Sequence, residues 1–166
     1  MKIHYHLPVV MVMLLSFVVS YAQQEKTAGY YKYNNTCLSS ELDGSVTILG
    51  WGAGRNRFDA LDQAQKNVLN DVLFVGILEG QSACWPKPLI NTPNARSMYR
   101  PFFDLFFNDR KGNWKKYVSS ADEQLVTKVL RDKKETQRGV LVSAVVRVNI
   151  PALRILLEEE GILIKP

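Results

Sequence analysis

The chain has 166 residues, a formal net charge of +5, two cysteines and two histidines. Both histidines, His4 and His6, lie in a leader that we expect to be removed. The mature chain would then have no histidine for a nucleophile pair, a histidine-ligated zinc or a proton shuttle. What remains is long enough to bury the core of one domain.

Residues 1–22 have the three parts of a secretory signal peptide. Lys2 precedes an apolar run over 7–19, and small residues follow at Ser20 and Ala22. The run is shorter than the roughly 20 apolar residues that a membrane span needs. No cysteine follows it directly, so the usual lipid-attachment signal is missing. We therefore predict a secreted or periplasmic protein, with outer-membrane association as an option; the alternative is an uncleaved membrane anchor.

After the leader, we predict a polar N-terminal arm over 23–43 and a single domain over 44–166. Cys37 lies in the arm and Cys84 in the domain. In an oxidising compartment an even pair of cysteines predicts a disulfide, and two buried thiols are the alternative.

The first elements of the domain are a strand and an amphipathic helix. An apolar strand is expected over 46–53, and Asn56 is suited to cap the helix that follows. From Phe58 to residue 75 the apolar residues recur at helical spacing. Polar side chains, including Lys66, Asn67 and Asn70, take the other face. We expect the helix to end near Gly76 or Gly80.

The segment from about 80 to 120 is predicted to be an irregular insertion, because three prolines interrupt it. Within it, a short helix is expected over 102–107 after Pro101, and another helical turn within 113–119. Two strand-like runs follow at 124–131 and 140–150 and predict a long hairpin. Pro151 opens a last helix, which Gly161 ends.

This order predicts an α+β fold, namely a two-layer sandwich. Its sheet would have three antiparallel or mixed strands, with the two main helices on one face, because that arrangement buries every apolar stripe.

Gly50, Gly52 and Gly54 join the strand to the helix as G-x-G-x-G. A dinucleotide site needs G-x-G-x-x-G and a second strand that ends in an acidic residue, and a P-loop needs Gly-Lys-Ser/Thr. Neither pattern is present, so we expect no cofactor. We interpret the glycines as a packing junction, where missing side chains let the helix cross close to the strand and positive φ is permitted at the turn.

The stretch VTILGWGAGRNRFDALDQAQKNVLNDVL, with the tail VLVSAVVRVNIPALRILLEEEGI, resembles a group of small bacterial envelope proteins. That group includes LPP-type lipoproteins and the N-terminal domain of the flagellar assembly protein FlgT. The resemblance covers residues 45–76 and 122–161, about half of the mature chain. It implies a non-enzymatic envelope module and carries over no catalytic residue. The long insertion and the missing lipidation cysteine depart from the pattern.

Residues 96–116 contain six basic and two acidic residues, a net charge of +4. Aromatic residues are interleaved with them, which would ordinarily indicate nucleic acid. Export argues against that and favours an envelope protein or an acidic envelope polymer as partner. The candidate partner surface is Arg96, Arg100, Arg110, Lys111, Trp114, Lys115 and Lys116. The alternative is a solvated surface over a small core of Phe102, Phe103, Phe106 and Phe107.

The function that we predict is therefore a non-catalytic secreted or periplasmic module for binding or assembly in the cell envelope. No catalytic, cofactor-binding or metal-ligating residue is assigned. One alternative is an envelope glycan hydrolase that uses carboxylates alone, for which Asp59, Asp62, Asp71 and Glu79 are the available acids. A secreted inhibitor-like protein is the other alternative.

Overall fold

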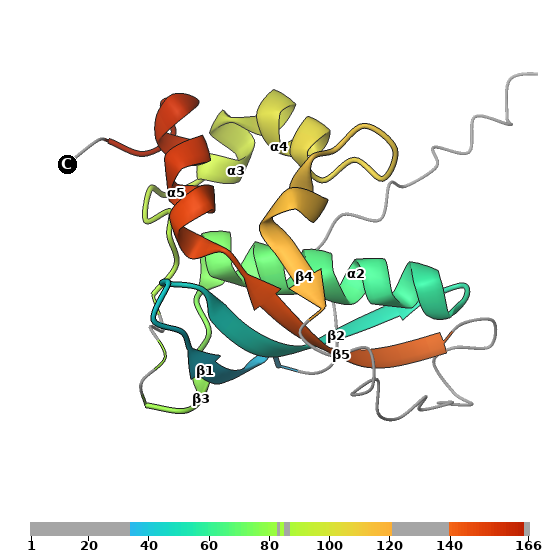
Figure 1. Cartoon of the computed structure of the whole chain (residues 1–166). Helices are drawn as coiled ribbons and strands as arrows, with labels where there is room; N and C mark the ends of the chain where they lie inside the picture. The colour runs from blue at the N-terminus through green and yellow to red at the C-terminus, as the bar shows by residue number, and fades with distance from the viewer. Residues whose placement is uncertain (1–33, 83, 85–86, 121–139, 165–166) are drawn as a thin grey trace, which may run out of the picture.

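The computed structural model describes residues 34–82, 84, 87–120 and 140–164. Its centre is a five-stranded mixed sheet in the order β3-β1-β2-β5-β4 (Figure 1). The strands are β1 (Thr36–Ser40), β2 (Val46–Gly54), β3 (Glu79–Gly80), β4 (Val118–Ser120) and β5 (Val140–Val148). Neighbouring strands are antiparallel, except that β1 and β3 are parallel. The predicted α+β class is confirmed.

The described helices lie on one side of this sheet (Figure 1). They are α2 (Arg57–Asn70), its π-helical continuation η1 (Asp71–Val75), α3 (Ala95–Met98), α4 (Arg100–Phe106), the 3-10 turn η2 (Trp114–Tyr117) and α5 (Ile150–Glu159). Helix α2 lies against the sheet, and α3, α4 and α5 are grouped beyond its C-terminal half. None of the helices in the described part of the chain has both the length and the apolarity that crossing a bilayer requires.

The expectation of three strands and two main helices is corrected in number. The strands expected over 46–53 and 140–150 are confirmed as β2 and β5, whereas the one expected over 124–131 lies outside the described residues. Strand β1 belongs to the segment that we expected to be an arm, and of its side chains only Cys37 is buried. β3, β4 and α3 have two, three and four residues, which is too short for a hydrophobic period to show.

The three glycines of β2 bring α2 against the sheet. A Cβ at Gly52 would lie 2.2 Å from the backbone oxygen of Ala60 and 2.2 Å from the backbone nitrogen of Ala64. A Cβ at Gly54 would lie 2.4 Å from the backbone nitrogen of Ala60. The packing interpretation is therefore confirmed. The second half of that prediction is wrong, because the three glycines continue β2 and none of them has positive φ.

Helix α2 begins and ends where its sequence predicts. The side chain of Asn56 accepts a hydrogen bond of 3.0 Å from the backbone N–H of Asp59. The last turn widens into η1, and Gly76, with φ of 91°, ends it. The N–H of Gly76 donates to the carbonyl of Asp71 over 2.7 Å.

One polar stripe of α2 is buried, although we expected it to face solvent. Asn67 donates to the carbonyl oxygen of Trp51 over 2.8 Å, and Asn35 donates to Asp71 over 2.8 Å. Asn35 also accepts from the backbone N–H of Trp51 over 3.3 Å. These side chains are buried because they satisfy the backbone of β2 and one another. They connect the segment before β1 to α2.

Candidate functional site

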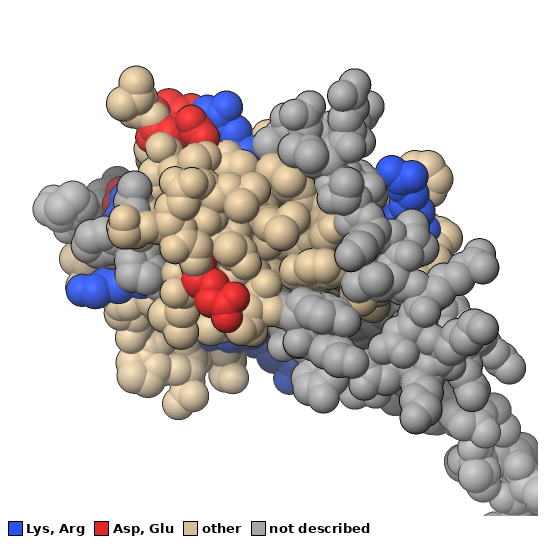
Figure 2. All heavy atoms as spheres, turned by 90° about the horizontal axis from the view of Figure 1, so that it is seen from below, with Lys and Arg blue, Asp and Glu red and all other residues tan. Residues whose placement is uncertain are grey.

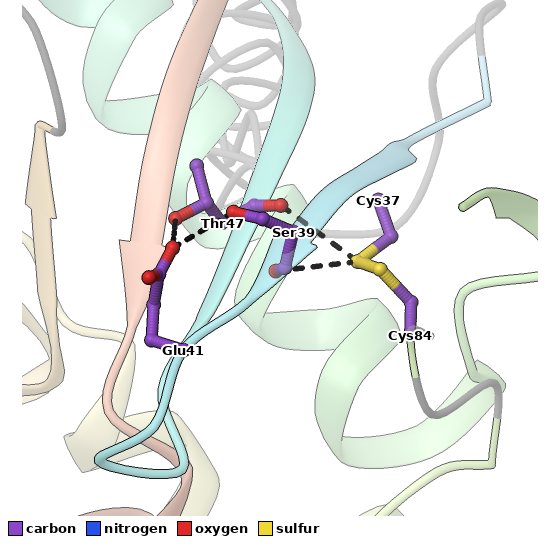
Figure 3. The surroundings of a disulfide bond; sticks show 5 residues. All are labelled: Cys37, Ser39, Glu41, Thr47 and Cys84. Carbon is purple, nitrogen blue, oxygen red and sulfur yellow. Dashed lines mark hydrogen bonds between the residues drawn. A yellow bond between two sulfur atoms is a disulfide. The ribbon is translucent and has the colours of Figure 1, made fainter. Parts of the chain in front are cut away.

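The predicted disulfide between Cys37 and Cys84 is present, with Cα atoms 6.2 Å apart (Figure 3). It joins β1 to the segment that follows β3. The backbone N–H of Gln81 donates to the carbonyl of Cys37 over 3.1 Å beside it. The disulfide thus fixes the start of the insertion to the sheet.

Trp114 does not belong to a partner surface. It is 0% exposed, and it anchors η2 in the core. The amines of Lys66 and Lys115 lie 5.4 and 5.1 Å from the centre of its ring, within the range of cation–π interactions. Lys66 also forms an ion pair with Asp109. The buried tryptophan therefore holds η2, with its two lysines, against the core.

Arg96 is half-buried and is engaged within the protein. Its guanidinium donates to Asn70 over 2.7 Å and lies 5.7 Å from the ring of Phe74 and 5.6 Å from that of Phe107. Burial lowers the pKa of Arg96, and Asp104 partly opposes that effect. Arg96 thus connects α3 to the end of α2.

The burial expected for the phenylalanines of the insertion is confirmed, but they belong to the main core of the domain and not to a small core of their own. Phe103, Phe106 and Phe107 are buried, and Phe102 is partly buried against them. Phe103 and Phe106 each make an edge-to-face contact with a neighbouring ring at a centroid distance of 4.9 Å. Such contacts hold α4 firmly, so the residues after it begin from a fixed position.

Two more of the predicted cations form exposed ion pairs. Arg100 lies 3.2 Å from Asp104 on the same helix, and Lys115 lies 2.8 Å from Asp62 of α2. Exposed pairs of this kind contribute about 0–1 kcal/mol to stability. A partner that competes for these cations therefore has to break ion pairs that contribute little to stability.

Arg110, Lys111 and Lys116 are exposed, and within the described ranges they take part in no ion pair. Arg110 and Lys111 donate their backbone N–H groups to the side chain of Asn108, which fixes the turn after α4. Together with Lys115, these three residues form what we call the basic segment, residues 110–116. Of the predicted surface, this segment and Arg100 are the parts that the fold leaves accessible.

Lys116 lines a polar groove of about 310 Å³ that lies between η2, β4 and the β1–β2 loop. Arg147 lies in the same groove and binds Asp43 over 2.8 Å and Ser45 over 2.8 Å. Hydrogen bonds from Ser45, and then the charge of Arg147, lower the pKa of Asp43. No sequence pattern indicated this groove, because Asp43 and Arg147 are 104 residues apart.

Figure 2 views the molecule from the sheet side. The visible described part of this face is mostly uncharged, with Lys and Arg toward the margins and an acidic group nearer the middle.

The acids considered for glycan hydrolysis lie in separate contacts. Asp59 pairs with Arg55 on the first turn of α2, and Asp62 pairs with Lys115. Asp71 is buried and accepts a hydrogen bond from Asn35. Glu79, in the exposed strand β3, accepts one from Asn34. These contacts account for all four carboxylates as parts of the fold. Among the described residues no group of three or more metal-ligating side chains comes together.

Comparison of the chain with models of protein families, with curated proteins and with solved structures finds no match.

Proposed function

We propose that the protein is a non-catalytic binding or assembly module of the cell envelope, secreted or periplasmic, that binds an acidic partner through the basic segment. The sequence resemblance to small envelope proteins supports the setting. The partner classes are an envelope protein with an acidic surface and an acidic envelope polymer.

The observation that carries this proposal is the accessibility of four cations over residues 110–116. Arg110, Lys111 and Lys116 keep their side chains exposed, and Lys115 is 56% exposed. The buried ring of Trp114 supports them, so binding would not need to order a flexible loop. A support of that kind lowers the entropic cost of association.

The adjoining groove favours an extended acidic partner. Its lining combines Lys116 with hydroxyl and amide groups, including Ser119 and Asn149, and with Arg147, which is paired with Asp43. Such groups donate hydrogen bonds to carboxylate or phosphate oxygens, and charge-assisted hydrogen bonds are stronger than neutral ones. The groove thus extends the basic segment onto the edge of the sheet.

The test is retention of envelope components by immobilised protein. We expect the Arg110→Gln/Lys111→Gln variant and the Lys116→Gln variant to retain less of the same component than the wild type does. The matched control is Arg55→Gln/Arg57→Gln, which removes two exposed positive charges at the start of α2.

Two further conditions identify the partner and its mode of binding. Digesting the extract with protease abolishes retention of a protein and spares retention of a polymer. Raising the salt concentration weakens retention, because exposed charges are screened. If both double variants lose retention equally, net charge rather than the basic segment is responsible, and the proposal fails. If wild-type protein retains nothing above background, it fails as well.

A further inference from the structure

A second hollow is lined by no residue of the basic segment and differs from the polar groove in chemistry. It has a volume of about 340 Å³ and lies between β1, β2, the end of α2 and the first turn of α5. This volume falls within the range of about 300–1,000 Å³ that small-molecule sites occupy. We call it the apolar pocket.

The walls of the apolar pocket come from four parts of the chain. Ile48 belongs to β2, Val72 to η1, Leu89 to the segment after the disulfide, and Ile150 to the start of α5. Hydrogen bonds fix the Leu89 wall, because its backbone N–H donates to the carbonyl of Val72 over 2.9 Å. The fold itself therefore holds the Leu89 wall against the Val72 wall.

The disulfide secures one more wall. Cys37 lines the pocket from β1, and its bond to Cys84 holds the following segment beside the sheet (Figure 3). A site with fixed apolar walls can bind an apolar group without a cost in ordering the protein. The apolar lining indicates that an apolar part of the ligand enters the pocket. The charged residues of the lining indicate which polar group the ligand carries.

The charged residues of the lining are Lys87, Arg154 and Glu41. Glu41 is engaged on its own strand pair, because its Oε1 atom accepts from Ser39 over 2.8 Å and from Thr47 over 3.2 Å (Figure 3). Arg154 is exposed, and it takes part in no ion pair of the described ranges. Lys87 has a contact of its own, so Arg154 is the principal cation for a ligand.

We infer that the apolar pocket binds the alkyl chain of a single-chain anionic amphiphile, whose carboxylate or phosphate lies at Arg154. Burial of the chain supplies most of the affinity, at about 0.8 kcal/mol for each buried methylene group. The guanidinium supplies the preference for an anion, since it donates two parallel hydrogen bonds to a carboxylate or a phosphate. None of the residues 110–116 lines this pocket, although the pocket and the polar groove share Ser45.

The experiment measures binding of dodecanoate to the purified protein by calorimetry, below the critical micelle concentration. Dodecyl phosphate distinguishes a phosphate head from a carboxylate. Dodecyltrimethylammonium and a neutral dodecyl glucoside carry the same chain with a different head. We expect the anionic compounds to bind, the neutral one to bind about fivefold more weakly, and the cationic one more weakly still.

Two kinds of variant separate the chain site from the head site. Leu89→Trp fills the pocket and should weaken binding of all the compounds by more than about tenfold. Ile150→Trp, at the mouth of the pocket, serves the same purpose if the first variant does not fold. Arg154→Gln should weaken the anionic compounds by about threefold to tenfold and leave the neutral one unchanged. Arg57→Gln, which removes an exposed cation from α2, is the matched control.

Three results would overturn the inference: no binding of either anionic compound, binding that is indifferent to Leu89→Trp and Ile150→Trp, or equal loss in Arg154→Gln and Arg57→Gln. The basic-segment variants, which should lose retention of the envelope partner, should still bind dodecanoate as the wild type does. The two proposals can therefore fail separately.

Discussion

Replacing Gly52 with alanine tests the contact on which the fold depends. The added Cβ would lie 2.2 Å from the oxygen of Ala60, 2.2 Å from the nitrogen of Ala64 and 2.8 Å from the Cα of Ala64. All three are backbone atoms of α2, so no side-chain rotation can relieve the contact. Ordinary contact begins at 3.4 Å, and the helix must recede from the strand by about 1 Å to reach it.

That displacement sets the magnitude. A gap of about 0.5–1 Å forfeits a quarter to a half of the dispersion energy across it, and α2 packs on β2 through buried Ala60, Ala64 and Val68. Overpacking in a core costs about 1–3 kcal/mol, and this site lies at the upper end because the helix backbone must move. Alanine also restricts the unfolded chain, which offsets the loss by about 0.4–1 kcal/mol. We expect a net loss of at least about 2 kcal/mol, or about 10 °C in Tm for a domain of this size.

The assay is thermal and urea unfolding of the purified protein, followed by circular dichroism. Ala53→Ser is the matched control, because it adds one heavy atom at the neighbouring position of β2 on an exposed side chain. Its stability should remain within about 0.5 kcal/mol of the wild type. Equal unfolding midpoints for Gly52→Ala, Ala53→Ser and the wild type would refute the packing junction.

A pair of double variants identifies the atoms responsible. At Gly50 the added Cβ would meet the Cγ2 atom of Val68 at 2.3 Å, which is a side-chain contact. Val68→Ala should therefore relieve part of the Gly50→Ala defect, with a favourable coupling of about 1 kcal/mol or more. Ala64→Gly should not relieve the Gly52→Ala defect, because glycine at position 64 keeps the backbone nitrogen and Cα that the added Cβ overlaps. Rescue by Ala64→Gly would contradict this account.

Three further predictions concern the disulfide, the buried polar network and acid stability. The Cys37→Ala/Cys84→Ala variant should lose about 4 kcal/mol of unfolding free energy, as the closure of a 47-residue separation implies, and an unchanged urea midpoint would exclude that role. Asn35→Ala removes the 2.8 Å donor to the buried carboxylate of Asp71, which keeps the longer bond from Asn70 at 3.4 Å, and should cost about 2 kcal/mol, measured in the same way, whereas a loss below about 0.5 kcal/mol would contradict it. Hydrogen bonds from a neighbouring serine lower the pKa of Asp43 in the folded state, so its stabilisation is present above the pKa of the unfolded chain and disappears as the pH falls through the folded value. Unfolding curves from pH 7 to pH 2 should show the wild type and Asp43→Asn converging in acid; a constant difference would refute the assignment.

The parts of the fold that the sequence predicted are those with a long hydrophobic period. Strand β5 has an apolar residue at every second position from Val140 to Val148, and α2 repeats its apolar positions over four turns. Local signals fixed the two ends of α2 and its continuation η1: Asn56 caps the first turn, and Gly76 ends the last one. The packing role of the β2 glycines was predicted correctly, because a helix can approach a strand that closely only where side chains are missing.

The candidate site was less predictable. Composition placed the excess of positive charge in residues 96–116, but it could not separate Trp114, which is fully buried, from Lys116, which is exposed. Both residue types occur on binding surfaces, and only the neighbours that cover a side chain decide its exposure. Arg96 and Lys115 found partners within the chain for the same reason.

The sequence by itself predicted the α+β class, the junction of β2 with α2 and which two cysteines would form a disulfide if one formed. The class follows from the local hydrophobic period, and the junction follows from local sterics. Two cysteines allow a single pairing. The tertiary structure decided the sheet order, the burial of Asn67 and Asn35, the polar groove and the apolar pocket. Each of those brings together residues that are distant in the chain, and their contacts depend on how whole elements pack, which no local pattern records.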